Sequence, residues 1–223
     1  MNYQIVRILE PEELAQILPR LAAGKFVDGK LTASGPAREV KNNLQVERSG
    51  PELTELDQIL LAAVRRNPLF QAFSFAKRIL LPVFNRYEVG MEYGPHVDSA
   101  VMGKGAEQIR TDLSMTIFLS DPASYEGGEL ALETPLGEDE IKLDAGEAVV
   151  YPSTTVHRVT PVTRGVRLAA ITWIQSSVPD ERLRGILFDL RNAVAKADSA
   201  GDPELRTLLH KSYNNLLRLA LDL

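Results

Sequence analysis

The chain has 223 residues with no cysteine and three histidines, and its 25 Lys and Arg against 30 Asp and Glu give a formal net charge of −5. The lack of cysteine excludes disulfides, iron–sulfur clusters, Cys-liganded zinc and a thiol nucleophile, so any chemistry here uses nitrogen and oxygen ligands. The mild acidity argues against nucleic acid as a partner. The sequence opens without a secretory signal pattern, and no apolar run approaches the roughly 18 residues of a membrane span, so we expect a cytoplasmic protein with no membrane partner.

Residues 1–76 predict an N-terminal strand followed by supporting helices. A β-like start at 3–9 precedes Pro11, which opens a helix whose apolar residues follow helical spacing and stop near Gly24. A second helix begins after Ser49 and ends at Asn67-Pro68, because the residue before a proline avoids helical backbone.

Residues 77–177 predict a core of antiparallel strands. Short β-like runs are separated by Gly, Pro, Asp and Ser, and over 113–120 apolar residues alternate with Ser and Thr. Many short strands with frequent turns favour an antiparallel sandwich or barrel over a parallel α/β sheet. Arg110 and Asp112 in this region suit either an ion pair at a strand edge or a place near the mouth of a site.

Residues 178–223 predict a C-terminal helical extension. Pro179-Asp-Glu opens one leucine-rich helix and Asp202-Pro-Glu opens another, and Ser199-Ala-Gly201 joins them into a hairpin. We expect this hairpin to pack on the sheet or to join two copies, which favours a homodimer through these helices. His210 lies in the last helix, where an ordinary exposed or packing role is expected.

Three side chains suggest a metal site. His96 and Asp98 are two residues apart, which places both on one face of an extended strand, although an exposed pair at a strand edge gives the same pattern. His157 follows an apolar strand and a Ser-Thr-Thr turn, and it could complete a set of two imidazoles and one carboxylate. That set leaves three octahedral positions open and suits non-haem Fe(II), while zinc stays chemically possible.

Arg167 is the first charge in an otherwise apolar strand, 166–174. A buried guanidinium needs an anionic partner, and its planar fork matches a carboxylate. Arg167 could therefore clamp a dicarboxylate, or it could lie at the exposed start of the strand or pair with a structural acid.

At these residues the sequence resembles a known family. The segments NRYEVGMEYGPHVD, RTDLSMTIFLSDPASYEGGELAL and GEAVVYPSTTVHRVTPVTRGVR are similar to the core of the Fe(II)- and 2-oxoglutarate-dependent dioxygenases of the prolyl 4-hydroxylase type. With FVDGKLTASGPAREVKNNLQ, the chain more narrowly resembles the bacterial PKHD-type hydroxylases, a group often linked to iron uptake. The resemblance runs from about Phe26 to the C-terminus.

The resemblance implies an α+β chain built on a double-stranded β-helix, the cupin-like jelly roll. It implies that His96, Asp98 and His157 bind catalytic iron and that Arg167 binds the distal carboxylate of 2-oxoglutarate, with help from Tyr87 unless that tyrosine only packs in the core. Gly127-Gly128 is similar to a family turn that we interpret as structural. Lys41-Asn-Asn43 is similar to a motif at the substrate entrance, although an exposed loop fits equally.

The implied reaction is hydroxylation of an unactivated C–H bond, with 2-oxoglutarate converted to succinate and CO2. The implied participants are Fe(II), 2-oxoglutarate, dioxygen, L-ascorbate as reductant, and an unidentified small-molecule or peptidyl substrate. Two alternatives stay open at this point. One is a non-catalytic jelly roll that senses the metal or 2-oxoglutarate, and the other is a zinc or manganese cupin-like isomerase.

Overall fold

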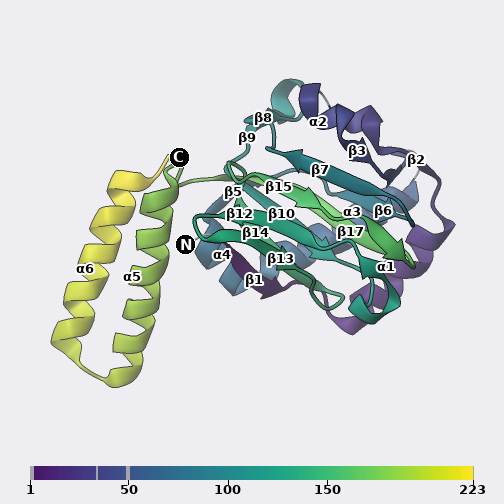
Figure 1. Ribbon diagram of the computed structural model, residues 1–223. Coiled ribbons are helices and arrows are strands. Elements are labelled where there is room, and N and C mark those ends of the chain that lie inside the picture. Colours follow the sequence, from purple (N-terminus) through teal and green to yellow (C-terminus); the bar gives the residue numbers. More distant parts are fainter. Residues whose placement is uncertain (1–2, 34, 49–50, 223) are drawn as a thin grey trace.

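The computed structural model describes residues 3–33, 35–48 and 51–222, and two facing antiparallel sheets form its centre (Figure 1). In these residues the larger sheet has eight strands in the order β1 (Gln4–Arg7), β14 (Glu147–Pro152), β10 (Leu113–Phe118), β17 (Arg167–Ser176), β6 (Val83–Tyr87), β4 (Leu44–Val46) and β2 (Phe26–Asp28), with β5 (Ala76–Ile79) also paired to β17.

The smaller sheet has the order β13 (Gly137–Ile141), β12 (Leu130–Thr134), β15 (His157–Val159), β7 (Glu92–His96) and β3 (Lys41–Asn42). Two short pairs, β11 (Glu126–Gly127) with β16 (Val162–Arg164) and β8 (Val101–Met102) with β9 (Ile109–Arg110), lie beside it. Side chains of both sheets pack together in one buried cluster that includes Phe118, Leu132 and Tyr151. This is the jelly-roll core that the sequence predicts.

Strand β10 shows how the sequence sets the two faces of the larger sheet. Leu113, Met115 and Ile117 point to the outer side and pack with the helices in the main hydrophobic cluster. Ser114 and Thr116 point to the inner side, yet both are buried because the second sheet covers them. The alternation is as predicted, and its polar face lines the space between the sheets instead of meeting solvent.

Helices α1 (Pro11–Ala23), α3 (Pro51–Arg66) and α4 (Pro68–Ser74) cover the outer face of the larger sheet (Figure 1). A short helix, α2 (Gly35–Glu39), lies near β7. The region 1–76 also supplies strands to both sheets, since β1 pairs with β14, β4 with β6 and β3 with β7. These pairings tie the N-terminal region to the strands that carry the candidate site.

Helices α5 (Glu181–Ala200) and α6 (Pro203–Ala220) form a hairpin that projects from one end of the core (Figure 1). Asp180 and Asp202 cap the helices through backbone N–H groups, and Gly201 takes the left-handed conformation that ends α5. Phe188 packs edge-on against Phe73 of α4 at 5.5 Å. In the described ranges no helix is long and apolar enough to cross a membrane.

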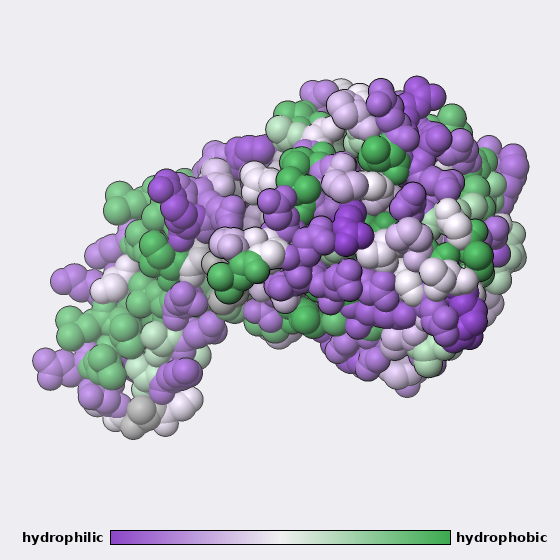
Figure 2. All heavy atoms as spheres, viewed as in Figure 1, coloured by the Kyte–Doolittle hydropathy of each residue, from purple (hydrophilic) through white to green (hydrophobic). Residues whose placement is uncertain are grey.

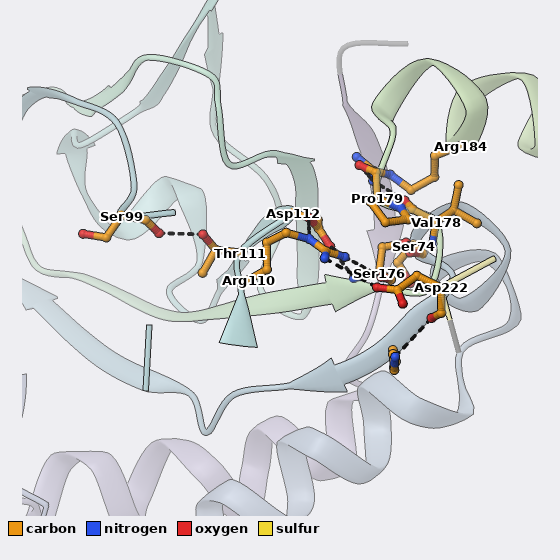
Figure 3. Close-up of polar contacts among 11 residues, drawn as sticks. Ser74, Ser99, Arg110, Thr111, Asp112, Ser176, Val178, Pro179, Arg184 and Asp222 are labelled. Carbon is orange, nitrogen blue, oxygen red and sulfur yellow. Dashed lines mark hydrogen bonds and ion pairs between the residues drawn. The ribbon is translucent and has the colours of Figure 1, made fainter. Parts of the chain in front are cut away.

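A partly buried polar cluster fastens the hairpin to the core (Figure 3). The Asp112 carboxylate accepts hydrogen bonds from Arg110 at 2.7 Å and from the Ser176 N–H at 2.8 Å. Arg184 of α5 is buried and donates to the Val178 carbonyl at 2.8 Å. Arg110 also lies 3.6 Å from Asp222, just after α6. The Arg110 and Asp112 pair therefore holds the base of the hairpin.

Candidate active site

The three candidate metal ligands meet at one end of the smaller sheet. His96 is the last residue of β7 and His157 the first of β15, and the two are direct cross-strand partners with ring centroids 4.2 Å apart. Asp98 lies just beyond the end of β7 and not on the same strand as His96, yet its carboxylate still meets the two imidazoles. One ligand atom from each of the three side chains lies within 4.8 Å of the others, so together they could hold one metal ion.

Neighbouring groups orient these side chains. The Nδ1 atoms of His96 and His157 lie 2.8 Å from the Gly94 carbonyl and 3.0 Å from the Thr155 carbonyl, so each Nδ1–H donates to backbone and each Nε2 is left with its lone pair. Asp98 accepts a hydrogen bond of 2.6 Å from the hydroxyl of Ser114. The sequence does not reveal these contacts, because they join residues that are distant in the chain or belong to the backbone.

The electrostatics of the site keep the His96 imidazole in the neutral form, which can bind a cation. Burial, and then the neighbouring His157, lowers the pKa of His96 to about 4, so its imidazole is neutral at pH 7. Tyr93 stacks on this ring with centroids 3.6 Å apart and fixes its plane. Neutral imidazole is the form that binds a metal.

Arg167 lies in the interior, only 1% exposed, at the start of β17. None of its three guanidinium nitrogens has a hydrogen-bond partner. Its charge lies 5.2 Å from the ring centroids of both Tyr87 and Phe118. A buried charge with every donor unused is costly, so this guanidinium has the chemistry to bind an anion. Arg167 is therefore not at an exposed strand start, and among the residues that the structure describes no acid forms an ion pair with it.

Two buried tyrosines accompany this arginine. Tyr87 is the cross-strand partner of Arg167, and its hydroxyl has no hydrogen-bond partner. The same is true of Tyr125, where burial raises the pKa and the nearby Arg167 opposes the shift. The sequence analysis did not single out Tyr125. The available signal was its position, because this aromatic residue directly precedes the Glu-Gly-Gly turn.

Gly128 gives these side chains their space. A Cβ atom here would lie 2.9 Å from Cδ of Arg167 and 3.3 Å from the Tyr125 ring, and the residue has φ +67°. The turn has a structural role, as predicted. That role is to let the Arg167 side chain approach the backbone closely.

One cavity of about 520 Å³ joins these features. The triad, Arg167 and Tyr87 line it, and its apolar wall includes Leu80, Val83, Ile171 and Trp173. Lys41 lines the same cavity and is buried, whereas Asn42 points outward and donates to the Gly90 carbonyl. The Lys41-Asn-Asn43 segment is therefore no exposed loop, since Lys41 and Asn43 face inward.

Known proteins share this fold. A family model described as the 2OG-Fe(II) oxygenase superfamily matches residues 82–175. The viral collagen prolyl hydroxylase vCPH from Paramecium bursaria chlorella virus-1, solved as its 2OG complex, is 17% identical and superposes with a TM-score of 0.55, covering 79% of this chain and 97% of that chain. HygX from Streptomyces hygroscopicus, solved with nickel, 2-oxoglutarate and hygromycin B bound, is 15% identical with a TM-score of 0.53 over 79% and 83% of the two chains.

Similarity in sequence is much closer to another set of proteins. A PKHD-type hydroxylase from Thermosynechococcus vestitus is 48% identical over 222 residues, which covers 98% of each chain. One from Burkholderia ambifaria is 43% identical over 98% of each chain. The predicted family is confirmed, and with it a hydroxylase that uses Fe(II) and 2-oxoglutarate: the chain belongs to the PKHD-type hydroxylases of the 2OG-Fe(II) oxygenase superfamily.

Proposed function

We propose that this enzyme hydroxylates an unactivated C–H bond, with His96, Asp98 and His157 as iron ligands and Arg167, Tyr87 and Tyr125 as the site of the distal carboxylate of 2-oxoglutarate. One observation carries the proposal: Arg167 is buried with all three guanidinium nitrogens unpartnered, in the cavity that also holds the triad. A dicarboxylate that reaches from Arg167 to the metal site uses both features at once.

The residues fit an Fe(II) and 2-oxoglutarate pair. Two imidazole nitrogens and one carboxylate are the donor set that suits non-haem Fe(II), and they would leave other positions on the ion open. The bound pair supplies the oxidant, and overall one dioxygen, one 2-oxoglutarate and one C–H bond yield succinate, CO2 and an alcohol.

The chain's own residues have simpler tasks. The two backbone carbonyls that accept the imidazole Nδ1–H groups, and the Ser114 hydroxyl on Asp98, hold the ligands in place. Arg167 with the two tyrosines holds the far end of the cosubstrate, and the apolar wall of the cavity excludes water from the reacting bond.

Several finer features belong to the same proposal. We expect L-ascorbate to sustain turnover by reducing oxidised iron, and we expect a substrate connected with iron uptake, as the resemblance noted in the sequence implies. We also expect a homodimer: Ile186, Leu205, Leu208 and Leu219 of the hairpin are exposed, and Figure 2 shows hydrophobic surface gathered there. The mass in solution, measured by light scattering, would contradict the homodimer if it matched one chain.

The test of the proposal is the substitution Arg167→Met. Losing two charge-assisted hydrogen bonds of about 1.5–3 kcal/mol each should weaken 2-oxoglutarate binding at least a hundredfold, measured by calorimetry with Mn(II) in place of iron. Arg164→Met, which removes an exposed arginine paired with Glu126, is the control and should leave the affinity unchanged. Equal affinity in R167M and the parent protein would refute the clamp.

Turnover separates the proposal from its two rivals. We expect iron-loaded protein to release succinate from 2-oxoglutarate, with products 16 Da heavier than their precursors in cell extract. A sensing module would bind 2-oxoglutarate without ever consuming it. An isomerase would regain activity with Zn(II) or Mn(II) in place of Fe(II).

A further inference from the structure

Lys41 is a buried cation that the iron and cosubstrate sites do not use. It is 6% exposed, begins β3 at the edge of the smaller sheet, and lines the cavity of the triad. Lysine is among the residues that are rarely buried without a partner. Its presence at this position needs an explanation.

The backbone around Lys41 is held rigidly against the strand that carries His96. The Gly94 N–H donates to the Val40 carbonyl at 2.9 Å, and a Cβ on Gly94 would lie 2.8 Å from Cβ of Val40. Only glycine allows this approach. The carbonyl of the same Gly94 accepts the hydrogen bond from His96. One residue therefore fixes the position of Lys41 relative to the candidate metal ligands.

The ammonium group itself has donors to spare. Nζ donates to the Thr32 hydroxyl at 3.2 Å and lies 5.2 Å from the centroid of the Tyr93 ring. The Thr32 hydroxyl in turn lies 2.6 Å from Oε1 of Gln45. In the part of the chain that the structure describes, Lys25 and Lys142 form ion pairs with carboxylates and Lys41 forms none. An ammonium has three N–H groups, so two are left for a ligand.

The charges of the loaded site leave Lys41 without an ion-pair partner. The two carboxylates of 2-oxoglutarate and that of Asp98 equal in number the charges of a divalent metal and the Arg167 guanidinium. Burial lowers the pKa of Lys41 only to about 8, so it is still charged at neutral pH. Asp28 also attracts the ammonium, but in the described residues no carboxylate forms an ion pair with it.

We infer that Lys41 binds a negatively charged group of the substrate, so that this hydroxylase acts on an anionic molecule, such as a carboxylate, and not on a neutral one. The inference rests on the proposed function and adds the substrate class to it. The rest of the cavity suits a partly apolar body, with Leu80, Leu81 and Ile171 in its wall and the indole N–H of Trp173 as a further donor without a partner.

The same ammonium could instead meet a carboxylate of 2-oxoglutarate, and the first measurement separates the two sources. With Mn(II) in place of iron and no oxygen, we expect the dissociation constant of 2-oxoglutarate to be unchanged in Lys41→Met. A loss of about tenfold or more, the effect of one charge-assisted hydrogen bond, would assign Lys41 to the cosubstrate and overturn the inference. Failure of the parent protein to bind Mn(II) and 2-oxoglutarate would instead refute the proposed function.

The second measurement uses acetate and its neutral analogue acetamide as probes of the Mn(II) and 2-oxoglutarate complex. The manganese speeds the proton relaxation of any small molecule held near it. We expect several-fold faster relaxation of acetate than of acetamide in the parent protein, no such difference in Lys41→Met, and a retained difference in Lys41→Arg. Lys104→Met, which removes an exposed lysine from the same cavity, should behave like the parent.

Equal relaxation of the two probes in the parent protein would overturn the inference without any variant, as would a preference for acetate that persists in Lys41→Met. Thermal unfolding checks that each variant is folded, and Lys41→Gln replaces Lys41→Met should the methionine variant fail that check.

Discussion

The absence of a side chain at Gly128 is as important to the candidate site as any functional group. Its φ is +67°, and a Cβ atom added there would lie only 2.9 Å from Cδ of Arg167, so alanine would strain the backbone and displace the guanidinium. We expect Gly128→Ala to lower stability by about 1–2 kcal/mol and to weaken 2-oxoglutarate binding at least tenfold, measured by calorimetry with Mn(II).

The control variant Gly90→Ala separates the loss of stability from the loss of 2-oxoglutarate binding. Gly90 also has positive φ, +83°, but a Cβ there would meet nothing within 4 Å. This control should lose a similar amount of stability and keep the parent affinity for 2-oxoglutarate. If both alanine variants bound the cosubstrate equally, Gly128 would have no part in placing Arg167.

At the scale of single residues, the sequence predicts those with a charge or a rare side chain. Arg167 stands out as the only charge in an apolar strand, and its burial decides against the exposed strand start that the sequence left open. The triad residues lie together as the spacing of His96 and Asp98 indicates, while their role as iron ligands stays a prediction. Ser114 could not be singled out, because serine is common and its contact with Asp98 arises only from the fold. For Tyr125 the two glycines that follow it were the one signal in the sequence.

Among the elements, the strand β10 and the segment before it connect the C-terminal hairpin to the candidate metal site. Asp112 accepts the Ser176 N–H at the hairpin base, and the Thr111 hydroxyl donates at 2.5 Å to the carbonyl of Ser99, the residue after Asp98 (Figure 3). Asp112→Ala should cost about 1–3 kcal/mol, since it leaves a buried N–H without a partner. Hydrogen exchange should then rise at 176–184, and Mn(II) binding should weaken.

A carboxylate at the far end of the hairpin supplies the control for that change. Asp198 pairs with Arg206 at 2.8 Å in an exposed position. Asp198→Ala should alter stability by less than about 1 kcal/mol and leave hydrogen exchange at the hairpin base as it is. Unchanged exchange at 176–184 in Asp112→Ala would contradict the fastening role.

The sequence indicates long elements well and short ones poorly. Helices α1 and α6 begin at the prolines that predict them, α5 begins two residues after Pro179, and α3 begins two residues after Ser49. Strands β2, β3 and β4 are two or three residues long, too short to show an alternating pattern. Strand β2 depends on its partner β4, β4 on β6, and β3 on β7. Because these pairings arise only in the fold, Lys41 could not be placed in the cavity from the sequence.

For the whole molecule, the buried charge of Lys41 sets a dependence of stability on pH. Burial lowers its pKa from 10.5 to about 8, against the opposing attraction of Asp98 and Asp28. Below pH 8 the ammonium is charged in both states but better hydrated in the unfolded chain, which lowers the free energy of unfolding by about 3 kcal/mol. Lys41→Met should thus be more stable near neutral pH.

Urea denaturation of metal-free protein at several pH values measures how this free energy of unfolding changes. Between about pH 8 and 10.5 the unfolded chain binds one proton more than the folded protein, so the parent gains stability and its deficit relative to Lys41→Met should shrink. Lys104→Met should track the parent throughout. A deficit of constant size across this range would show that Lys41 carries no shifted pKa.

The C-terminal hairpin leaves and rejoins the core at one point, since the Asp222 N–H donates to the Ser177 carbonyl at 2.7 Å. The two helices, thirty-eight residues in all, therefore form an insertion whose two ends lie side by side. Residues can be added to this insertion or removed from it without moving any strand. The tip at Gly201 points away from the sheets (Figure 1). It is the place to insert a fluorescent label or an affinity tag, because whatever is added there is carried outward on two helices and leaves the cavity open.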